Sequence, residues 1–420
     1  MAVTFEKISP NLDLNHKVNL RKARGESLVN MAFGEARLPP FPALVDHLIA
    51  GARRNSYGSV LGDDQAREAV SRYFTRRRQP TSPDQVILAP GSKPLLMALN
   101  LVLPGDVLLP RPCWNTYAPQ AHLAGKHAYG IPIPDDCGGV PEPTALRDSI
   151  RAARLLGHDP RIVVVTLPDN PTGTLAPPDT VREICAIAEE EDLFIVSDEI
   201  YRDLVHDTRA QILSPAEVVP HRVVVTSGLS KSLAIGGWRI GVARFPSSSA
   251  GMHVRDGVAS AASEIWSTLA RPMQSVAAYA FSEPPELRAH VAATARLHGE
   301  LARAVHGIMV NAGATCRRPT GGFYVYPDFE PLRANLALHG VTDSDSLRDH
   351  LLEEYGIAVL AGHLLGDDSK TLRFKAATSM LYGENEEQQW AALNSPRPLT
   401  LPHIREYLTR IEEAIAKLCA

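Results

Sequence analysis

Short apolar runs recur through the first two thirds of the chain, with helix-like segments between them. The runs are rich in Val, Ile and Leu and cover residues 86–89, 107–110, 162–167, 193–197, 223–227 and 240–245. Runs of this length that stay apolar at successive positions are typical of strands buried on both faces. Their alternation with helical segments predicts an α/β fold, in which helices cover a mostly parallel central sheet in a large domain.

The pattern changes after about residue 287. It predicts a long helix over 287–310, a strand-like segment over 322–326, a helix over 345–355 and a final helix over 402–418. We therefore expect an N-terminal segment (1–35) that contributes to a small domain, a large domain (36–286) and a small C-terminal α+β domain (287–420). The stretch 381–401 is rich in Glu, Gln and Pro, which predicts an irregular excursion on the surface.

Composition excludes several classes of protein. A net charge of -4 over 420 residues provides no basic surface for nucleic acid, and the basic run 76–78 is interpreted as the solvated end of a helix around 67–74. The five cysteines are scattered without a CxxC pair, so we expect neither disulfides nor a metal site, and a cytoplasmic location is favoured. No stretch has the length and hydropathy of a signal peptide or a membrane span.

Polar side chains follow three of the apolar runs. Asp198 directly follows the end of a run, and Asn170 and Lys231 each stand a few positions after one. In open parallel sheets, ligands bind outside the carboxyl ends of the strands. The sequence therefore predicts that these three residues meet in one site.

Lys231 is the outstanding candidate for a nucleophilic amine. Desolvation beside a sheet and a nearby positive charge keep a lysine amine neutral, and Arg239 supplies such a charge. The pair Gly236 and Gly237 lets the loop fold back, so that the Arg239 guanidinium and the Ser230 hydroxyl can hold one phosphate group. The alternative is a solvated lysine on a surface loop.

The segments around these residues resemble a known family. Residues 227–241 (SGLSKSLAIGGWRIG) resemble the lysine signature of the class I/II aminotransferases, and Asn170–Gly173 (NPTG) and Ser197–Tyr201 (SDEIY) precede it in that family's order. The resemblance covers most of the chain. It implies fold type I and a pyridoxal 5′-phosphate (PLP) cofactor held as a Schiff base on Lys231.

The resemblance also assigns roles around the cofactor. PLP chemistry needs a proton held on the pyridine nitrogen, which is the role of a carboxylate, here Asp198. Asn170 and Tyr201 would bond the ring oxygen, and Trp114 would stack on the ring. The phosphate would bind to Gly91, Ser92, Lys93, Ser230, Arg239 and Tyr57, the last supplied by the neighbouring subunit of a homodimer. The alternatives are a helix N-cap for Asp198, a turn for Asn170 and an ordinary buried side chain for Trp114.

For the substrate, the resemblance assigns Arg373 to the carboxylate and places the main chain of Gly34 beside it. Strand alternation puts Lys375 on the same face as Arg373, where it either adds positive potential or is solvated. His363 either reaches the mouth of the pocket or is exposed.

The expected reaction is ping-pong transfer of an amino group from an amino acid to a 2-oxo acid, within amino-acid metabolism or biosynthesis. The alternatives are a PLP-dependent Cβ or Cγ lyase, a replacement enzyme or an oxidase on the same scaffold. A regulator built on the fold would need a DNA-binding module, for which the segment before Asn30 is too short. The amino acid itself stays open.

Overall fold

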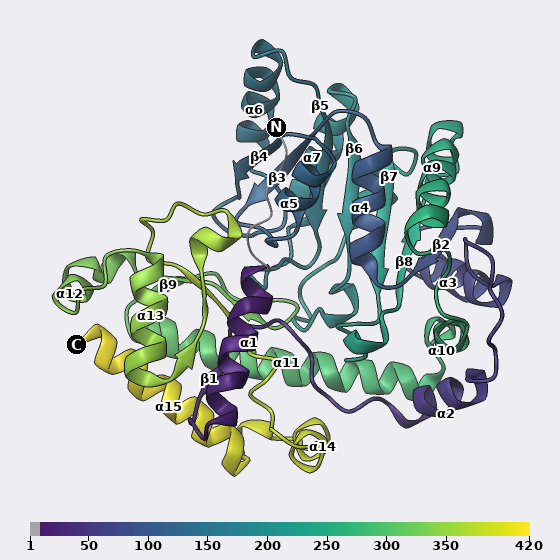
Figure 1. Cartoon of the computed structure of the whole chain (residues 1–420). Coiled ribbons are helices and arrows are strands. Elements are labelled where there is room, and N and C mark those ends of the chain that lie inside the picture. Colours follow the sequence, from purple (N-terminus) through teal and green to yellow (C-terminus); the bar gives the residue numbers. More distant parts are fainter. Residues whose placement is uncertain (1–8) are drawn as a thin grey trace.

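A seven-stranded sheet dominates the part of the chain that the computed structural model describes, residues 9–420 (Figure 1). Its order is β2-β8-β7-β6-β5-β3-β4, and all neighbours are parallel except β8, which runs antiparallel to β2 and β7. The strands are β2 (Val86–Ala89), β3 (Asp106–Arg111), β4 (Ala128–Pro132), β5 (Pro160–Thr166), β6 (Phe194–Asp198), β7 (Val223–Gly228) and β8 (Gly241–Arg244). This confirms the predicted α/β fold; β4, an edge strand with mixed burial, is the strand that the apolar runs did not reveal.

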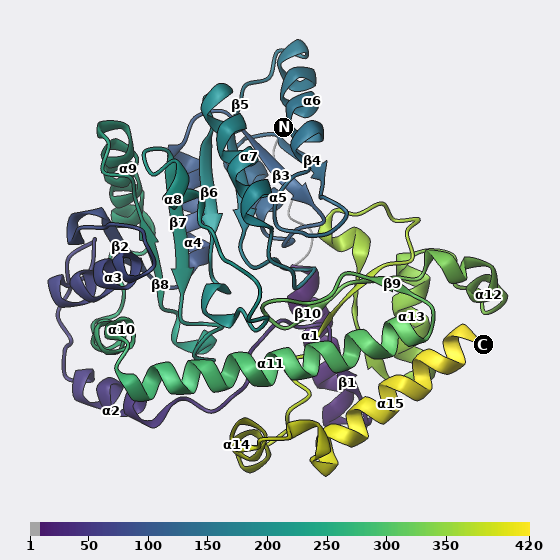
Figure 2. The same cartoon turned by 180° about the vertical axis from the view of Figure 1, so that it is seen from behind.

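Helices cover both faces of this sheet. On the face toward the viewer in Figure 1 lie α4 (Ser92–Val102), α5 (Tyr117–Leu123) and α9 (Ser249–Ile265). The other face, seen in Figure 2, carries α6 (Pro143–Leu155), α7 (Pro178–Glu190) and α8 (Pro215–Val218), and α3 (Asp64–Arg76) and α10 (Arg271–Ser282) join its core. The central strands are buried on both faces because each face packs into its own apolar core.

The C-terminal part forms a second core around short strands. The three-stranded sheet β10-β14-β13 is antiparallel, and β1 pairs in parallel with β12. The strands are β1 (Val29–Asn30), β9 (Thr315–Cys316), β10 (Tyr324–Val325), β11 (Pro327–Asp328), β12 (Ile357–Ala358), β13 (Leu360–Ala361) and β14 (Phe374–Ala377). The helices are α1 (Pro10–Ala23), α11 (Pro285–Asn311), α12 (Arg333–Leu338), α13 (Ser344–Tyr355), α14 (Glu386–Asn394) and α15 (Pro402–Cys419), whereas α2 (Pro42–Gly51) packs against α10 in the core of the large sheet.

The long helix α11 links the two parts. In Figure 2 it runs beneath the large sheet from α10 toward α15. The pairing of β1 with β12 brings the N-terminal segment to the C-terminal core, in keeping with the expected division 1–35, 36–286 and 287–420. The division itself stays a prediction, and residues 1–8 of its first segment lie outside the described residues.

The stretch 381–401 differs from its prediction. It contains α14 and a short 3-10 helix at 398–400, and Ala392 and Leu393 are buried in the C-terminal core. The prediction of an irregular surface excursion is therefore wrong for α14. The charged residues 386 and 387 at the start of the helix concealed its apolar face, which packs against α11.

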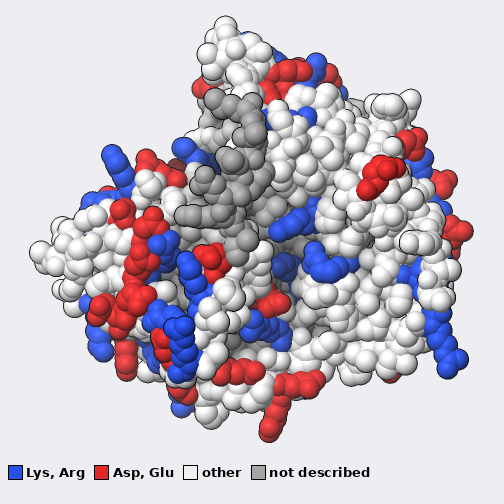
Figure 3. All heavy atoms as spheres, in the orientation of Figure 1, with Lys and Arg blue, Asp and Glu red and all other residues white. Residues whose placement is uncertain are grey.

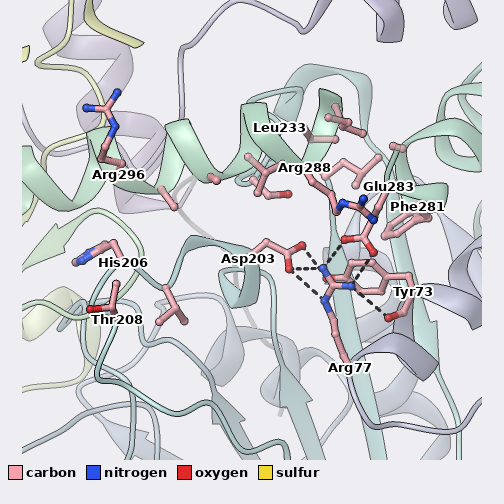
Figure 4. A pocket seen from close by; sticks show the side chains of 18 of the residues that line it. Tyr73, Arg77, Asp203, His206, Thr208, Leu233, Phe281, Glu283, Arg288 and Arg296 are labelled. Atoms are coloured by element: carbon pink, nitrogen blue, oxygen red, sulfur yellow. Dashed lines mark hydrogen bonds and ion pairs between the residues drawn. The ribbon is translucent and has the colours of Figure 1, made fainter. Parts of the chain in front are cut away.

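The basic run 76–78 is not simply solvated. Arg77 lines a cavity of about 590 Å³. Its guanidinium forms ion pairs there with the carboxylates of Asp203 and Glu283 (Figure 4). It also lies over the ring of Tyr73, with Cζ 3.5 Å from the ring centroid. The prediction was wrong for Arg77 because its acidic partners lie far away in the sequence.

Among the described residues, no helix is long and apolar enough to cross a membrane. All five cysteines are free thiols.

Candidate active site

A cavity of about 420 Å³ lies where the large sheet meets the C-terminal part. On the face drawn in Figure 3, Lys and Arg side chains gather around a hollow near the centre. The cavity brings together most of the residues that the sequence singled out, namely Gly34, Ser92, Lys93, Trp114, Asn170, Asp198, Tyr201, Ser230, Lys231 and Arg239. Strand ends explain this, since the apolar runs stop at the same edge of the sheet.

Lys231 projects into this cavity from the loop after β7. Its Nζ donates a hydrogen bond to the main-chain oxygen of Gly34 at 2.5 Å. Removal from bulk water lowers the pKa of Lys231 to about 8, and the charges of Arg239 and Lys93 act in the same direction, whereas Glu35 opposes them. The amine is therefore deprotonated more readily than an ordinary lysine, as a nucleophile requires.

Asp198 ends β6 at the floor of the cavity. Its Oδ2 accepts a hydrogen bond from the Tyr117 hydroxyl at 2.9 Å, and Thr166 lies 2.9 Å from the same hydroxyl. Burial raises the pKa of Asp198 to about 6, and the bond from Tyr117 counteracts part of that rise. No helix begins at Asp198, so its N-cap alternative is excluded. A buried carboxylate in this position is suited to hold a cationic N–H group.

Asn170 and Tyr201 lie on the walls above β5 and β6. The Tyr201 hydroxyl is hydrogen-bonded to that of Tyr324 at 2.7 Å. The Asn170 Oδ1 atom is buried and has no hydrogen-bond partner within residues 9–420. A buried polar atom without a partner is costly, so its presence at a cavity wall points to a polar ligand.

One end of the cavity is built for an anion. Gly91 precedes α4 with φ +91°, and an added Cβ there would collide with the Arg239 guanidinium. The side chains of Ser92, Lys93, Ser230 and Arg239 line this end. Burial, together with the charge of Arg239, lowers the pKa of Lys93. A helix N-terminus with two cations and two hydroxyls is suited to a phosphate group.

Trp114 stands between this anion site and the floor. It lines the cavity, and its ring centroid is 5.1 Å from the Lys93 Nζ atom. Its ring meets that of Tyr117 edge to face, with centroids 5.3 Å apart. A flat ligand in the cavity would therefore have an aromatic wall beside it.

The PLP molecule implied by the resemblance fits these residues. Its phosphate corresponds to the anion end of the cavity, and its pyridine nitrogen corresponds to the carboxylate of Asp198. Its ring oxygen corresponds to the side chains of Asn170 and Tyr201. Lys231 lies among them with a lowered pKa. The fit rests on side-chain chemistry and on the orphaned Asn170 oxygen.

Four residues from the sequence prediction do not line the cavity, and one of them, Gly91, directly precedes α4 beside the cavity residue Ser92. Arg373 is paired instead with Asp328 and Asp367. Tyr57 is 90% exposed on this chain. His363 lies outside the cavity walls, where its Nδ1 is 3.0 Å from the Ser344 hydroxyl.

Lys375, by contrast, lines the cavity and is 1% exposed, so the solvated alternative for this residue is wrong. Sequence reasoning missed Tyr117, Thr166 and Tyr324. Thr166 is the last residue of β5, and its polar side chain near the end of the apolar run 162–167 was a signal that could have revealed it. Tyr117 and Tyr324 gave no such signal because their contacts depend on tertiary packing.

The sequence as a whole is similar to that of known aminotransferases. The family model described as aminotransferase class I and II matches residues 26–381. An aspartate/prephenate aminotransferase from Thermus thermophilus is 28% identical over 375 residues, covering 85% of this chain and 88% of that protein. One from Cereibacter sphaeroides is 29% identical over 389 residues, covering 87% and 92%.

Solved structures agree in fold. The aspartate aminotransferase from Thermus thermophilus with maleate has a TM-score of 0.81 at 24% identity and covers 97% of both chains. The aromatic aminotransferase from Pyrococcus horikoshii has a TM-score of 0.77 at 20% identity, covering 95% of this chain and 99% of that one. At these identities the likeness concerns the fold.

Proposed function

The chain belongs to the class I and II aminotransferase family, and on that premise we propose that Lys231 is the residue that carries its PLP cofactor. The function of the chain is PLP-dependent transfer of an amino group between an amino acid and a 2-oxo acid. A lyase, a replacement enzyme or an oxidase on the same scaffold is not favoured, because the matching family and relatives are aminotransferases. The observation that carries the proposal for Lys231 is its amine of lowered pKa inside the cavity.

The surrounding residues hold the cofactor in this proposal. Ser92, Lys93, Ser230 and Arg239 bind its phosphate together with the main chain at Gly91, since they form the anion end of the cavity. Asp198, supported by Tyr117, holds the proton of the ring nitrogen, and Asn170 and Tyr201 bond the ring oxygen. When bound, PLP supplies a ring that accepts electrons from the Cα atom of the substrate.

Lys231 has a second task in this proposal, which is to move a proton. Once the substrate amine has replaced it, its free amine takes the Cα proton and later returns it. A pKa of about 8 suits this role near neutral pH, because the amine can both accept and release a proton. The two halves of the reaction would then follow each other in ping-pong order.

We further propose that the enzyme is a homodimer with shared sites. Tyr57 is 90% exposed on the single chain and lies outside its own cavity, as expected of a side chain that completes the phosphate site of a neighbour. The scattered free cysteines and the net charge of -4 support a cytoplasmic enzyme of amino-acid metabolism or biosynthesis with no nucleic-acid partner.

The test is direct. Protein purified with PLP is expected to be yellow, and borohydride reduction followed by peptide mapping is expected to place the adduct on Lys231. Addition of an amino acid without a 2-oxo acid is expected to leave the amine form of the cofactor, and a screen that begins with aspartate and the aromatic amino acids would identify the donor. A colourless protein that does not bind added PLP, or an adduct on another lysine, would contradict the proposal.

A further inference from the structure

The cavity of about 590 Å³ that Arg77 lines is separate from the active-site cavity (Figure 4). One loop divides the two: Leu229, Ser232 and Leu233 line the larger cavity, whereas Lys231 lines the active-site cavity. Small-molecule sites enclose roughly 300–1,000 Å³, so the larger cavity has the size of a ligand site. A ligand in it would contact the loop that carries Lys231.

One end of this cavity is closed by charges that already have partners. The carboxylates of Asp203 and Glu283 both form ion pairs with Arg77. The other oxygen of Asp203 accepts a hydrogen bond from the Tyr73 hydroxyl at 2.8 Å, and the other oxygen of Glu283 lies 2.6 Å from the Arg76 guanidinium. Because every carboxylate oxygen at this end is paired, the end offers no acceptor for the ammonium group of a ligand.

The cavity also contains a cation without a counter-ion. All three arginines of α11, Arg288, Arg296 and Arg303, line it. Arg296 is paired with Glu300 at 3.0 Å, and Arg288 is exposed to water. Arg303 is half-buried and has no acidic partner within residues 9–420; its Nη1 donates a hydrogen bond to Nδ1 of His206 at 3.3 Å.

His206 positions the Arg303 guanidinium without compensating its charge. Burial, together with the charge of Arg303, lowers the pKa of His206 to about 4, so the imidazole is neutral at pH 7. Gly299 of α11 packs against both side chains, since an added Cβ there would lie 2.6 Å from the His206 ring and 2.9 Å from Nη1 of Arg303. A guanidinium carries five N–H donors, so further donors of Arg303 are free for an anion.

Much of the remaining wall is apolar. It includes Leu229, Leu233, Leu287, Val291 and Ala295. In Figure 4, Leu233 lies between the side of the cavity where His206 is drawn and the side where Arg77 is drawn. A ligand whose anionic group lies at Arg303 would therefore bury an apolar body along the cavity.

We propose that this cavity is an effector site for a small carboxylic acid that has an apolar body and no amino group. The carboxylate binds to Arg303, and the body packs against Leu229 and Leu233. Acids with an aromatic or branched apolar body, including 2-oxo acids of that kind, belong to this class. The coupling of the site to turnover rests on the proposed function, because it acts through the loop of Lys231, whereas binding to the cavity does not.

The first test locates a probe in crystals of the cofactor-loaded protein. The probe is 3-(4-bromophenyl)propionate, whose bromine is identified by its anomalous scattering. We expect bromine in the cavity and the carboxylate within hydrogen-bond distance of Arg303. Bromine only in the active-site cavity, or only on the surface, would overturn the proposal.

The second test measures affinity in solution by calorimetry. Arg303→Met removes the charge, Arg303→Lys keeps it, and Arg288→Met is the matched variant of the exposed arginine on the same helix. We expect Arg303→Met to weaken binding to the cavity roughly 10- to 100-fold, Arg303→Lys to recover part of that loss, and Arg288→Met to change it by less than about threefold. The neutral amide of the probe should bind about as weakly to the wild type as the acid binds to Arg303→Met. An unchanged affinity in Arg303→Met, or equal binding of acid and amide, would contradict the assignment.

The third test separates an effector from a competitor of the substrate. At saturating concentrations of amino acid and 2-oxo acid, a competitor is displaced, whereas an effector still acts. We expect the probe to change kcat of the wild type by at least about twofold under these conditions and to leave kcat of Arg303→Met unchanged. A probe that binds the cavity and leaves kcat of the wild type unchanged would overturn the effector role.

The cofactor absorption and the borohydride adduct are recorded for every variant, so that the two proposals fail separately. Their absence from the wild type would contradict the cofactor assignment to Lys231 and leave binding to the cavity measurable. Their retention in every variant, with probe affinity that does not depend on Arg303, would contradict only the effector site.

Discussion

The side-chain amine of Lys231 donates a hydrogen bond to the main-chain oxygen of Gly34 at 2.5 Å, although 197 positions separate the two residues. The bond joins the loop after β7 to the segment after β1. The amine of Lys231 therefore lies where the large sheet meets the N-terminal segment, and each side of this junction can be tested by substitution.

Lys231→Ala is expected to abolish transamination, with a loss in kcat of roughly a thousandfold or more, because it removes both the covalent attachment and the proton carrier. Steady-state kinetics and borohydride mapping check this result. Lys417→Ala, on the exposed side of α15, is the control and should retain full activity. Substantial activity in Lys231→Ala would show that another group does this work.

Gly34→Ala is expected to disturb the cavity without unfolding the protein. An added Cβ would collide with the Tyr324 hydroxyl, whose partner is the Tyr201 hydroxyl. Displacement of these groups should lower kcat/KM roughly 10- to 100-fold. Gly307→Ala has open space around its Cβ and should behave as the wild type; an active Gly34→Ala would mean that the wall is more adaptable than its packing indicates.

Cofactor affinity is expected to depend on the protonation of Asp198. The pKa of Asp198 in the apoprotein is raised to about 6, so PLP binding should weaken as the pH falls through this value and the carboxylate becomes neutral. Tyr117→Phe removes a hydrogen bond that lowers this pKa, and the weakening should then begin about one pH unit higher. Fluorescence titrations of the apoprotein between pH 5 and 8 measure the shift, and a shift toward lower pH would contradict the role of Tyr117.

Lys375 is expected to destabilise the folded apoprotein at neutral pH. Its pKa is lowered from 10.5 to about 7. The unfavourable free energy of the buried charge therefore destabilises the folded state fully below pH 7, and this destabilisation disappears as the pH rises toward 10.5. Lys375→Met should therefore raise Tm at pH 7, by an amount that corresponds to about 2 to 4 kcal/mol, and the gain should vanish near pH 10.5. A gain that is independent of pH would indicate packing rather than charge.

Arg77→Ala is expected to lower stability without affecting chemistry. Arg77 is 17% exposed and binds Asp203 and Glu283, from two separate segments, so its removal leaves the Tyr73 hydroxyl as the remaining partner of Asp203 and Arg76 as that of Glu283. The expected loss is about 2 to 4 kcal/mol, measured as a lower Tm. Arg72→Ala, on the helix α3 that ends just before Arg77, is the control, since Arg72 is 68% exposed and its ion pair with Glu68 should contribute less than about 1 kcal/mol.

The sequence alone determined the sheet and the group of polar residues that gathers at one of its edges. Val, Ile and Leu runs form strands because both faces are buried, and the residues after them must gather at one edge of the sheet. Asn170, Asp198 and Lys231 could therefore be assigned to one site without coordinates.

Only the tertiary structure decided which charged side chains are buried and which partners they have. The pairing of Arg373 with Asp367 and Asp328, and the burial of Lys375 without an anionic partner among residues 9–420, depend on loops that the sequence does not place relative to β14. The same holds for Arg77, whose acidic partners follow it by more than a hundred positions. Hydrophobic periodicity reports which face of an element is buried, whereas the partner of a charge depends on distances of a few ångströms between segments remote in the sequence.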